Sequence, residues 1–418
     1  MVIKHRLESG ITVLLEPIKG VVSASVGVWI KTGSRNEAER QYGYAHFVEH
    51  MLFKGTSSLT AKEIASIVDR VGGQHNAATN REYTCYYINI VSDHIELALK
   101  ILSDMYYNSL FSPDEIEKEK NVIIEEIRMY EDTPDEFIHD LFMESMLSGH
   151  PLSHSILGTI ETISETSRES MLRFYDQHYS NENCIITIAG NIDENAVKGM
   201  MDKYFALRRD VASAGDQKRE TPPQRIDRRH VDRDLEQIHF CLGTEGIRSN
   251  DPDRWALYAL STILGGSMSS RLFQNIREKE GISYSIYSFH SSYTDCGVYG
   301  VYCATSPDNY DRAVELICKE CRDMLHPGVT AEELQDAKSF MIGNLALSLE
   351  SVEVRMSQLA KNEVLYGRHY SFDEMVKMIQ AITHDDFIRV TERIFKEKTL
   401  SLVSLGGRSG GAPADLRL

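Results

Sequence analysis

Apolar and polar positions along the first half of this 418-residue chain follow two periodicities in turn. Residues 3–32 alternate in the manner of hairpin strands, and a helical pattern follows that ends at Gly55. After a turn at Gly72-Gly73, strand-like alternation continues to about Val91. Long helical patterns then begin. The order predicted for this half is therefore strands, one helix, strands and a series of helices.

The second half repeats this order. Strands are predicted around 229–244, a helix over 253–264 that ends at a glycine pair, strands over 282–304 and helices from 308 onward. The best match between the halves pairs PDEIEKEK at 113–120 with AEELQDAK at 331–338, an offset of 218 residues. A repeat of this kind indicates two related domains.

The predicted organisation is a first domain at 1–209, a linker at 210–224 and a homologous second domain at 225–418. The linker sequence DVASAGDQKRETPPQ is rich in small and charged residues and in proline, and it lacks both periodicities. Alternating strands beside long helices predict an α+β fold in which each domain is a mainly antiparallel sheet with helices packed on one face.

Charge restricts the classes of partner. The chain has 45 basic and 62 acidic residues, a formal net charge of −17, which argues against nucleic acid and anionic membrane surfaces and favours cationic partners. No apolar run reaches the roughly 18 residues of a membrane span. The opening residues read as a strand without a leader, and the seven cysteines read as reduced thiols. We therefore expect a cytoplasmic protein with no membrane span.

Candidate chemistry begins with His46, Glu49 and His50 in the first predicted helix. Residues spaced i, i+3 and i+4 lie on one face of a helix. Two neutral imidazoles there can hold one Zn²⁺, and the glutamate can take a proton from a metal-bound water whose pKa falls to about 7. The H-x-x-E-H order is that of the inverted zinc-protease motif.

A catalytic zinc ion needs a third protein ligand, and the predicted helix over 114–132 offers several acids. Glu119 and Glu126 are seven residues apart and share a face, whereas Glu125 is turned about 100° away from Glu126. This makes Glu126 the predicted ligand and Glu119 a carboxylate that orients a ligand. The alternative for any single glutamate here is a solvated acidic face.

The second half serves as an internal control for this site. When the two helix ends are aligned, Ala256, Ala259 and Leu260 stand opposite the two histidines and Glu49. The offset of 218 places Asn344 opposite Glu126. The second half thus has the scaffold without the ligands, and we expect one Zn²⁺ per chain.

The motif at 46–50, followed by Glu126, resembles the pitrilysin-like family of zinc peptidases, within which the processing peptidase β subunit and its bacterial relatives are most similar. The resemblance extends over nearly the whole chain. Further matching segments are GGQHNAAT at 72–79, FY at 174–175, YSNEN at 179–183 and GGSMSSRL at 265–272.

The resemblance implies that the two domains form half of a clamshell, and it assigns roles to single residues. His46, His50 and Glu126 become the zinc ligands, Glu49 the general base and Glu119 the supporting glutamate. The edge of a strand would receive an extended substrate by β-augmentation. The residues at that edge are Asn76, Ala77, Ala78 and Thr79.

The resemblance also implies contributions from outside the zinc-binding domain. Arg277 and Tyr284 match a pair in the second domain that closes on substrate, and the pair would reach the zinc of a partner subunit. A homodimer is then the simplest active form. Glu136 and Asp140 match acidic residues that receive a substrate arginine, so we expect a preference for basic peptides, against the alternative of a solvated face.

The function predicted from the sequence is a zinc endopeptidase that cleaves short or unfolded peptides. One alternative is a non-catalytic scaffold or peptide-binding subunit of the same fold. A second is a metal-storage or structural-zinc protein, which would not need Glu49 because a base beside the metal serves only chemistry.

Overall fold

The computed structural model describes residues 2–207, 226–407 and 416–418. The predicted linker at 210–224 lies outside the described residues. The chain forms two compact units, and each unit takes one segment from the other half of the sequence. Tyr130–Ser153 belongs to the second unit, and Ser348–His369 belongs to the first.

The first unit is built on a six-stranded sheet in the order β1-β2-β6-β3-β5-β4. Its strands are β1 (Ile3–Arg6), β2 (Thr12–Pro17), β3 (Ser23–Ile30), β4 (Gln74–Thr79), β5 (Thr84–Val91) and β6 (Cys184–Gly190). All neighbours pair antiparallel except β2 and β6. Strand β4 is therefore an edge strand, paired on one side only.

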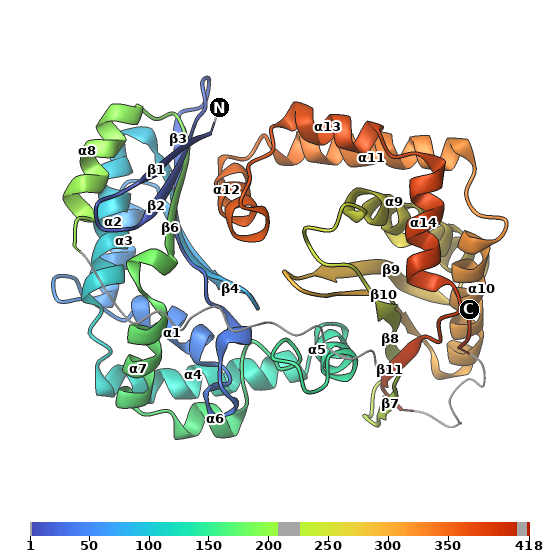
Figure 1. Ribbon diagram of the computed structural model, residues 1–418. Coiled ribbons are helices and arrows are strands. Elements are labelled where there is room, and N and C mark those ends of the chain that lie inside the picture. The colour runs from blue at the N-terminus through green and yellow to red at the C-terminus, as the bar shows by residue number, and fades with distance from the viewer. Residues whose placement is uncertain (1, 208–225, 408–415) are drawn as a thin grey trace. The chain divides into compact units, whose positions relative to one another are not determined.

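Helices cover both faces of this sheet (Figure 1). They are α1 (Tyr44–Leu52), α2 (Ala61–Arg70), α3 (Ile95–Asn108), α4 (Pro113–Glu131), α6 (Ile160–Glu165), α7 (Arg168–His178), α8 (Glu194–Tyr204) and α12 (Val352–Tyr366). Side chains alternate along β3, so that Val28 joins the main core while Trp29 points to the opposite face. On that opposite face Trp29 packs with Met356 and Leu359 of α12.

The second unit has a five-stranded sheet in the order β7-β11-β8-β10-β9. Its strands are β7 (Arg228–Val231), β8 (Ile238–Glu245), β9 (Ser283–Ser292), β10 (Gly297–Thr305) and β11 (Ser401–Leu405). Only the pair of β7 and β11 is parallel. Its helices are α5 (Pro134–Met146), α9 (Arg254–Gly265), the π-helix η5 (Phe273–Lys279), α10 (Tyr310–Leu325), α11 (Ala331–Ser348), α13 (Phe372–Gln380) and α14 (His384–Phe395).

Both faces of the second sheet are also apolar. Phe240 and Leu242 of β8 point into the main core, and Cys241 between them points to the opposite face. There Cys241 packs with Ile138 and Phe142 of α5, a helix from the first half of the sequence. Helix α5 thus covers the second sheet in the same way that α12 covers the first.

The predicted α+β class with mainly antiparallel sheets is confirmed. The expectation that helices pack on only one face of each sheet is wrong, because α12 and α5 cover the opposite faces. The predicted domains are contiguous halves of the chain. In the structure, each compact unit instead includes one helical segment from the other half. The physical reason is that each sheet has a second apolar face, and periodicity identifies an apolar helix face without identifying the sheet that it covers. One helix end also differs, since α1 ends at Leu52, three residues before Gly55.

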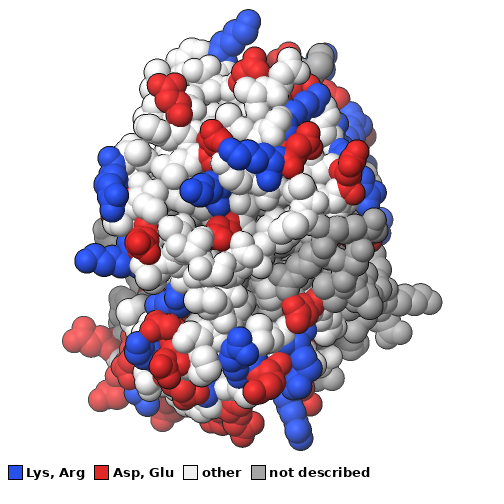
Figure 2. Space-filling view, turned by 90° about the vertical axis from the view of Figure 1, so that its left-hand side faces the viewer, with Lys and Arg blue, Asp and Glu red and all other residues white. Residues whose placement is uncertain are grey.

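Figure 2 shows acidic and basic side chains interspersed over one face of the molecule. Among the residues that the structure describes, no helix combines the length and the apolar character that crossing a membrane requires.

Candidate metal centre

Helix α1 has an apolar face that packs in the core and a second face that carries polar side chains. Phe47, Val48 and Met51 are fully buried in the core of the first unit. His46, Glu49 and His50 lie on the remaining face, as the i, i+3, i+4 spacing predicts. Burial of the apolar face fixes the rotation of the helix about its axis, and this fixes where the three polar side chains point.

The structure brings the three predicted ligands together. The Nε2 atoms of His46 and His50 are 3.1 Å apart. Nε2 of His46 lies 3.7 Å from Oε1 of Glu126 on helix α4, and Nε2 of His50 lies 3.6 Å from Oε2 of the same carboxylate. Within the described part of the chain, these residues form the only group of three or more histidine, cysteine or acidic side chains that are placed to hold a metal ion.

These separations fit a tetrahedral zinc site. With ligand bonds of about 2.0–2.1 Å, two ligands of a tetrahedral ion are about 3.3 Å apart. The measured separations of 3.1, 3.6 and 3.7 Å lie close to that value. Two imidazoles and one carboxylate leave the fourth position open, which is the donor set of a catalytic rather than a structural zinc site.

The protonation of the two imidazoles also suits a cation. Burial lowers the pKa of His46 to about 3, with a further contribution from His50, so its imidazole is neutral as a ligand must be. Burial acts in the same direction on His50, but its hydrogen bond with Glu119 and the nearby carboxylates outweigh burial and raise the pKa of His50. The surroundings of His50 therefore favour positive charge, which a divalent cation would supply.

Glu119 takes the orienting position predicted for it. Its side chain is buried on α4, with Oε1 2.8 Å from Nδ1 of His50 and Oε2 2.5 Å from Nζ of Lys54. Burial by itself would raise the pKa of Glu119, but the hydrogen bonds from His50 and Lys54 outweigh it and lower that pKa. An ionised Glu119 holds the hydrogen of His50 on Nδ1, so the lone pair of Nε2 faces Glu126 and His46.

Glu49 lies on the same helix face and contacts strand β4. Its Oε2 accepts a hydrogen bond of 2.5 Å from Oγ1 of Thr79. Burial raises the pKa of Glu49, and the bond from Thr79 offsets part of that rise. A carboxylate with a raised pKa is better suited to accept a proton near neutral pH.

The predicted substrate edge coincides with β4. Asn76 and Ala78 are exposed, whereas Ala77 and Thr79 are half-buried, as expected for a strand with one covered face. Every residue from Gln74 to Thr79 pairs with β5 on one side. The other side of β4 is the edge of the sheet.

The structure also brings Arg277 and Tyr284 together, within the second unit. The guanidinium of Arg277 in η5 lies 4.3 Å from the ring centroid of Tyr284 and 4.5 Å from that of Phe273. The side chain of Tyr284, at the start of β9, is 77% exposed. An aromatic ring stacked on a guanidinium forms a rigid pair with a free outer surface.

The two acids predicted to receive a substrate arginine lie on α5, also in the second unit. Glu136 is exposed and Asp140 is half-buried, and they are one helical turn apart. These placements agree with both the predicted role and the alternative of a solvated face.

Sequence reasoning missed two residues near the metal centre. Lys54, which holds Glu119, lies two residues beyond the end of α1, so helical spacing gave no signal for it. Glu37, whose carboxylate binds the start of α1, lies in the preceding loop. Periodicity gives no signal for a residue in a loop.

Comparison with known proteins supports the same chemistry. The family model described as insulinase (peptidase family M16) matches residues 12–160, and the model described as the peptidase M16 inactive domain matches residues 165–341. An uncharacterized zinc protease, YmxG of Bacillus subtilis, is 38% identical over 408 residues, which cover 97% of this chain and 99% of that protein. An uncharacterized zinc protease of Streptomyces coelicolor is 36% identical, and the match covers 95% of this chain and 88% of that protein.

Solved structures agree in fold. A crystal structure of a protease from Helicobacter pylori superposes with a TM-score of 0.89 at 24% identity, over 97% of this chain and 99% of the other. A structure described as the peptidase M16 inactive domain from Pseudomonas fluorescens gives 0.90 at 21% identity, over 99% and 100% of the two chains. Taken with the ligand set on α1 and α4, the family models and the relatives show that this chain belongs to the pitrilysin-like peptidase family M16.

Proposed function

We propose that this protein is a zinc-dependent endopeptidase. The observation that carries the proposal is the arrangement of Glu49 beside the triangle of His46, His50 and Glu126. A storage or structural zinc site has no need of Glu49, whereas hydrolysis needs a base next to the metal.

Zinc bound by these three residues would act as a Lewis acid toward a carbonyl oxygen and would lower the pKa of water to about 7. Glu49 accepts the proton of the attacking water and later delivers it to the leaving amine. Thr79 donates a hydrogen bond to Oε2 of Glu49 and so orients the carboxylate that takes up that proton. Glu119 keeps Nε2 of His50 directed at the site.

The substrate is an extended peptide segment. The edge of β4 offers backbone N–H and C=O groups to a strand laid against it, and this mode of binding reads the backbone more than the side chains. Thr79 is both the last residue of that edge and the partner of Glu49, so the edge leads to the base. Short or unfolded peptides fit this requirement, because a folded chain has no free strand to add.

Arg277 and Tyr284 stabilise the bound substrate and the reacting carbonyl. The stacked geometry of the pair supports this role, because it presents a charged and an aromatic group together. The active form is a homodimer in which the pair of one subunit completes the metal centre of its partner, since each chain holds one ligand set and one such pair.

Basic segments are the preferred substrates. Glu136 and Asp140 place two negative charges on successive turns of α5, and an arginine would relieve their mutual repulsion. The net charge of −17 attracts cationic peptides over longer distances.

We place the protein in the cytoplasm. Its seven cysteines all fall within the described residues, where they are buried. Reduced thiols are typical of the cytoplasm, and disulfides are typical of oxidising compartments. Cell fractionation followed by immunoblotting tests this location.

The test of function is cleavage of a quenched fluorescent peptide with a central arginine. We expect zinc-loaded wild type to cleave it, and we expect Glu49→Gln to retain zinc while kcat falls by about 10²- to 10⁴-fold. Glu125→Gln, which changes an exposed glutamate beside the ligand Glu126, is the matched control and should cleave normally. Removal of zinc by a chelator should abolish cleavage, and added zinc should restore it.

The alternatives give different results. A non-catalytic peptide-binding subunit would bind the peptide without cleaving it in zinc-loaded wild type. A storage or structural-zinc protein would bind zinc and show no activity that depends on Glu49. Either result would refute the endopeptidase.

A further inference from the structure

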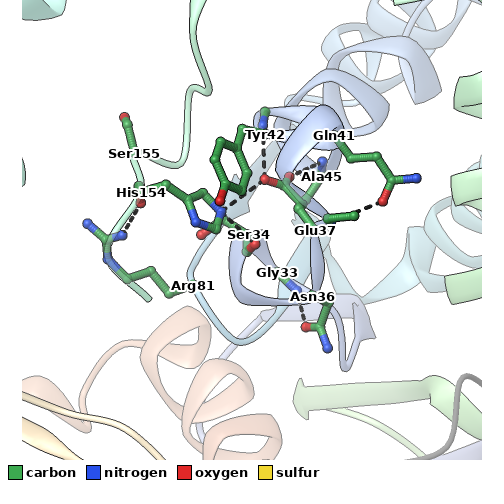
Figure 3. A network of polar contacts seen from close by, with 12 residues as sticks. Gly33, Ser34, Asn36, Glu37, Gln41, Tyr42, Ala45, Arg81, His154 and Ser155 are labelled. Carbon is green, nitrogen blue, oxygen red and sulfur yellow. Dashed lines mark hydrogen bonds and ion pairs between the residues drawn. The ribbon is translucent and has the colours of Figure 1, made fainter. Parts of the chain in front are cut away.

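The loop between β3 and α1 is organised around a buried glutamate, Glu37. Its side chain is 0% exposed. Oε2 accepts a hydrogen bond of 2.9 Å from the backbone N–H of Gly43, and Oε1 accepts one of 2.7 Å from the N–H of Ala45 (Figure 3). Both oxygens of the carboxylate are thus used by the start of helix α1.

These N–H groups belong to the end of the helix that lacks internal partners. The first four N–H groups of a helix find no acceptor within the helix, and negative charge is favoured there. Gly43 occupies the N-cap position and has no side chain to act as a cap; its φ is +92°, and a Cβ would lie 2.6 Å from the backbone oxygen of Leu157. Glu37 supplies the missing cap from outside the helix.

A second set of contacts ties Glu37 to its surroundings. Nε2 of His154 lies 2.8 Å from the backbone oxygen of Ser34 and 3.3 Å from Oε2 of Glu37. Nδ1 of His154 is buried and finds no partner among the described residues, so Nε2 carries the hydrogen and donates. The ring of Tyr42 stacks on the imidazole with centroids 3.9 Å apart.

The same network reaches the end of the substrate edge. Arg81, two residues beyond strand β4, donates from its guanidinium to the backbone oxygen of His154. The backbone oxygen of Arg81 accepts a hydrogen bond of 2.9 Å from the N–H of Arg35 in the loop. Gly33 lets the loop approach this closely, because a Cβ there would lie 2.0 Å from the backbone oxygen of Asn80.

The network therefore fixes the first turn of α1 against the chain that leaves β4. Because a helix is rigid over nine residues, the position of Ala45 determines the positions of His46, the next residue, and of Glu49, one turn further on. The hydrogen bond between Thr79 of β4 and Glu49 of α1 depends on that same alignment. A small displacement of the helix would disturb both the ligand triangle and the base.

We propose that Glu37 is a positioning residue for the metal centre, which holds helix α1, and with it His46 and Glu49, in register with the end of strand β4. The inference rests on the proposed zinc site and adds a residue that touches neither metal nor substrate. Its effect on zinc passes through the backbone of Gly43 and Ala45.

The test is zinc affinity of the intact protein, measured by competition with a chromophoric chelator, together with the visible spectrum of the Co²⁺-substituted form. Glu37→Gln leaves one oxygen to serve two N–H groups. We expect it to remain folded by circular dichroism, to bind zinc about tenfold or more weakly and to change the Co²⁺ absorption bands. In peptide cleavage kcat should fall while KM stays within about twofold.

Glu63→Gln is the matched control. Glu63 caps helix α2, where Oε2 accepts a hydrogen bond of 2.8 Å from the N–H of Thr60, and α2 carries no ligand. This variant should keep the zinc affinity and Co²⁺ spectrum of wild type. Zinc affinity within about twofold of wild type in folded Glu37→Gln would overturn the proposal.

A second variant covers the case in which Glu37→Gln does not fold. His154→Ala keeps both hydrogen bonds from the helix to Glu37 and removes the ring that holds the carboxylate. We expect a weaker effect in the same direction, a loss of about threefold in zinc affinity, and no loss would overturn the proposal. Absence of zinc binding in wild type would refute the proposed function itself, whereas normal binding in the variants would refute only the role of Glu37.

Discussion

Glu119→Gln isolates the contribution of the carboxylate that orients His50. Glu119 makes two charged contacts: Oε1 lies 2.8 Å from Nδ1 of His50, and Oε2 lies 2.5 Å from Nζ of Lys54. The residue is 4% exposed. An amide has the same shape but can satisfy only one of these contacts, since its NH₂ group faces a donor whichever way it is turned. Loss of such an orienting carboxylate typically weakens metal binding by 10- to 100-fold, or about 1.4–2.7 kcal/mol.

The assay is equilibrium competition for zinc between the protein and a chromophoric chelator at neutral pH. Glu117→Gln is the control, because Glu117 lies on the same helix, is exposed and pairs with Lys120 at 2.8 Å. We expect Glu119→Gln to lose 10- to 100-fold in zinc affinity and Glu117→Gln to lose less than about twofold. Equal affinities in the two variants would refute the argument that Glu119 directs Nε2 of His50 toward the metal.

Three further predictions test the packing, the pH dependence and the second unit. Met356→Ala should destabilise the first unit by about 2–5 kcal/mol in urea unfolding, because Met356 is 0% exposed between α12 and the sheet. Val354→Ala, on the exposed side of α12, should change the free energy of unfolding by less than about 0.5 kcal/mol. Similar losses in the two variants would argue against the packing of α12 on this sheet. Burial lowers the pKa of His290 from 6.5 to about 4, so the unfolded chain takes up a proton as the pH falls through 6.5 and the folded chain does not until about 4. Stability should therefore fall in that window by up to about 1.4 kcal/mol per pH unit, and His290→Phe should reduce this slope, while an unchanged slope would exclude His290 as a source. Arg277→Lys should lower kcat/KM for peptide cleavage by about tenfold without changing zinc affinity, because an ammonium cannot stack on Tyr284 as a guanidinium does. A fall in zinc affinity would contradict this assignment.

Periodicity predicted the helices that carry the candidate metal ligands to within a few residues. The pattern over 114–132 corresponds to α4 at Pro113–Glu131, and the choice of Glu126 over Glu125 followed from a rotation of about 100° per residue. The structure agrees, since Glu126 faces the two histidines and Glu125 forms an exposed ion pair with Arg128. Such predictions succeed because they depend only on the geometry of one helix.

The contacts between elements could not be predicted in this way. Lys54 reaches Glu119, and Glu37 reaches the N–H groups of Gly43 and Ala45, only because separate segments pack together. The pairing of Thr79 with Glu49 likewise joins a strand to a helix. Spacing along the chain carries no information about such partners.

The sequence by itself determined the candidate ligand set and the class of the fold. Two histidines and a glutamate at helical spacing, and a second acid on a helix of known phase, specify a ligand set because helical geometry is local. Only the tertiary structure decided that α12 covers the sheet of the first unit and that α5 covers the sheet of the second. It also decided which residues hold α1 in place. Hydrophobic burial is not directional, so an apolar helix face identifies neither the sheet on which it packs nor the polar groups that this packing brings together.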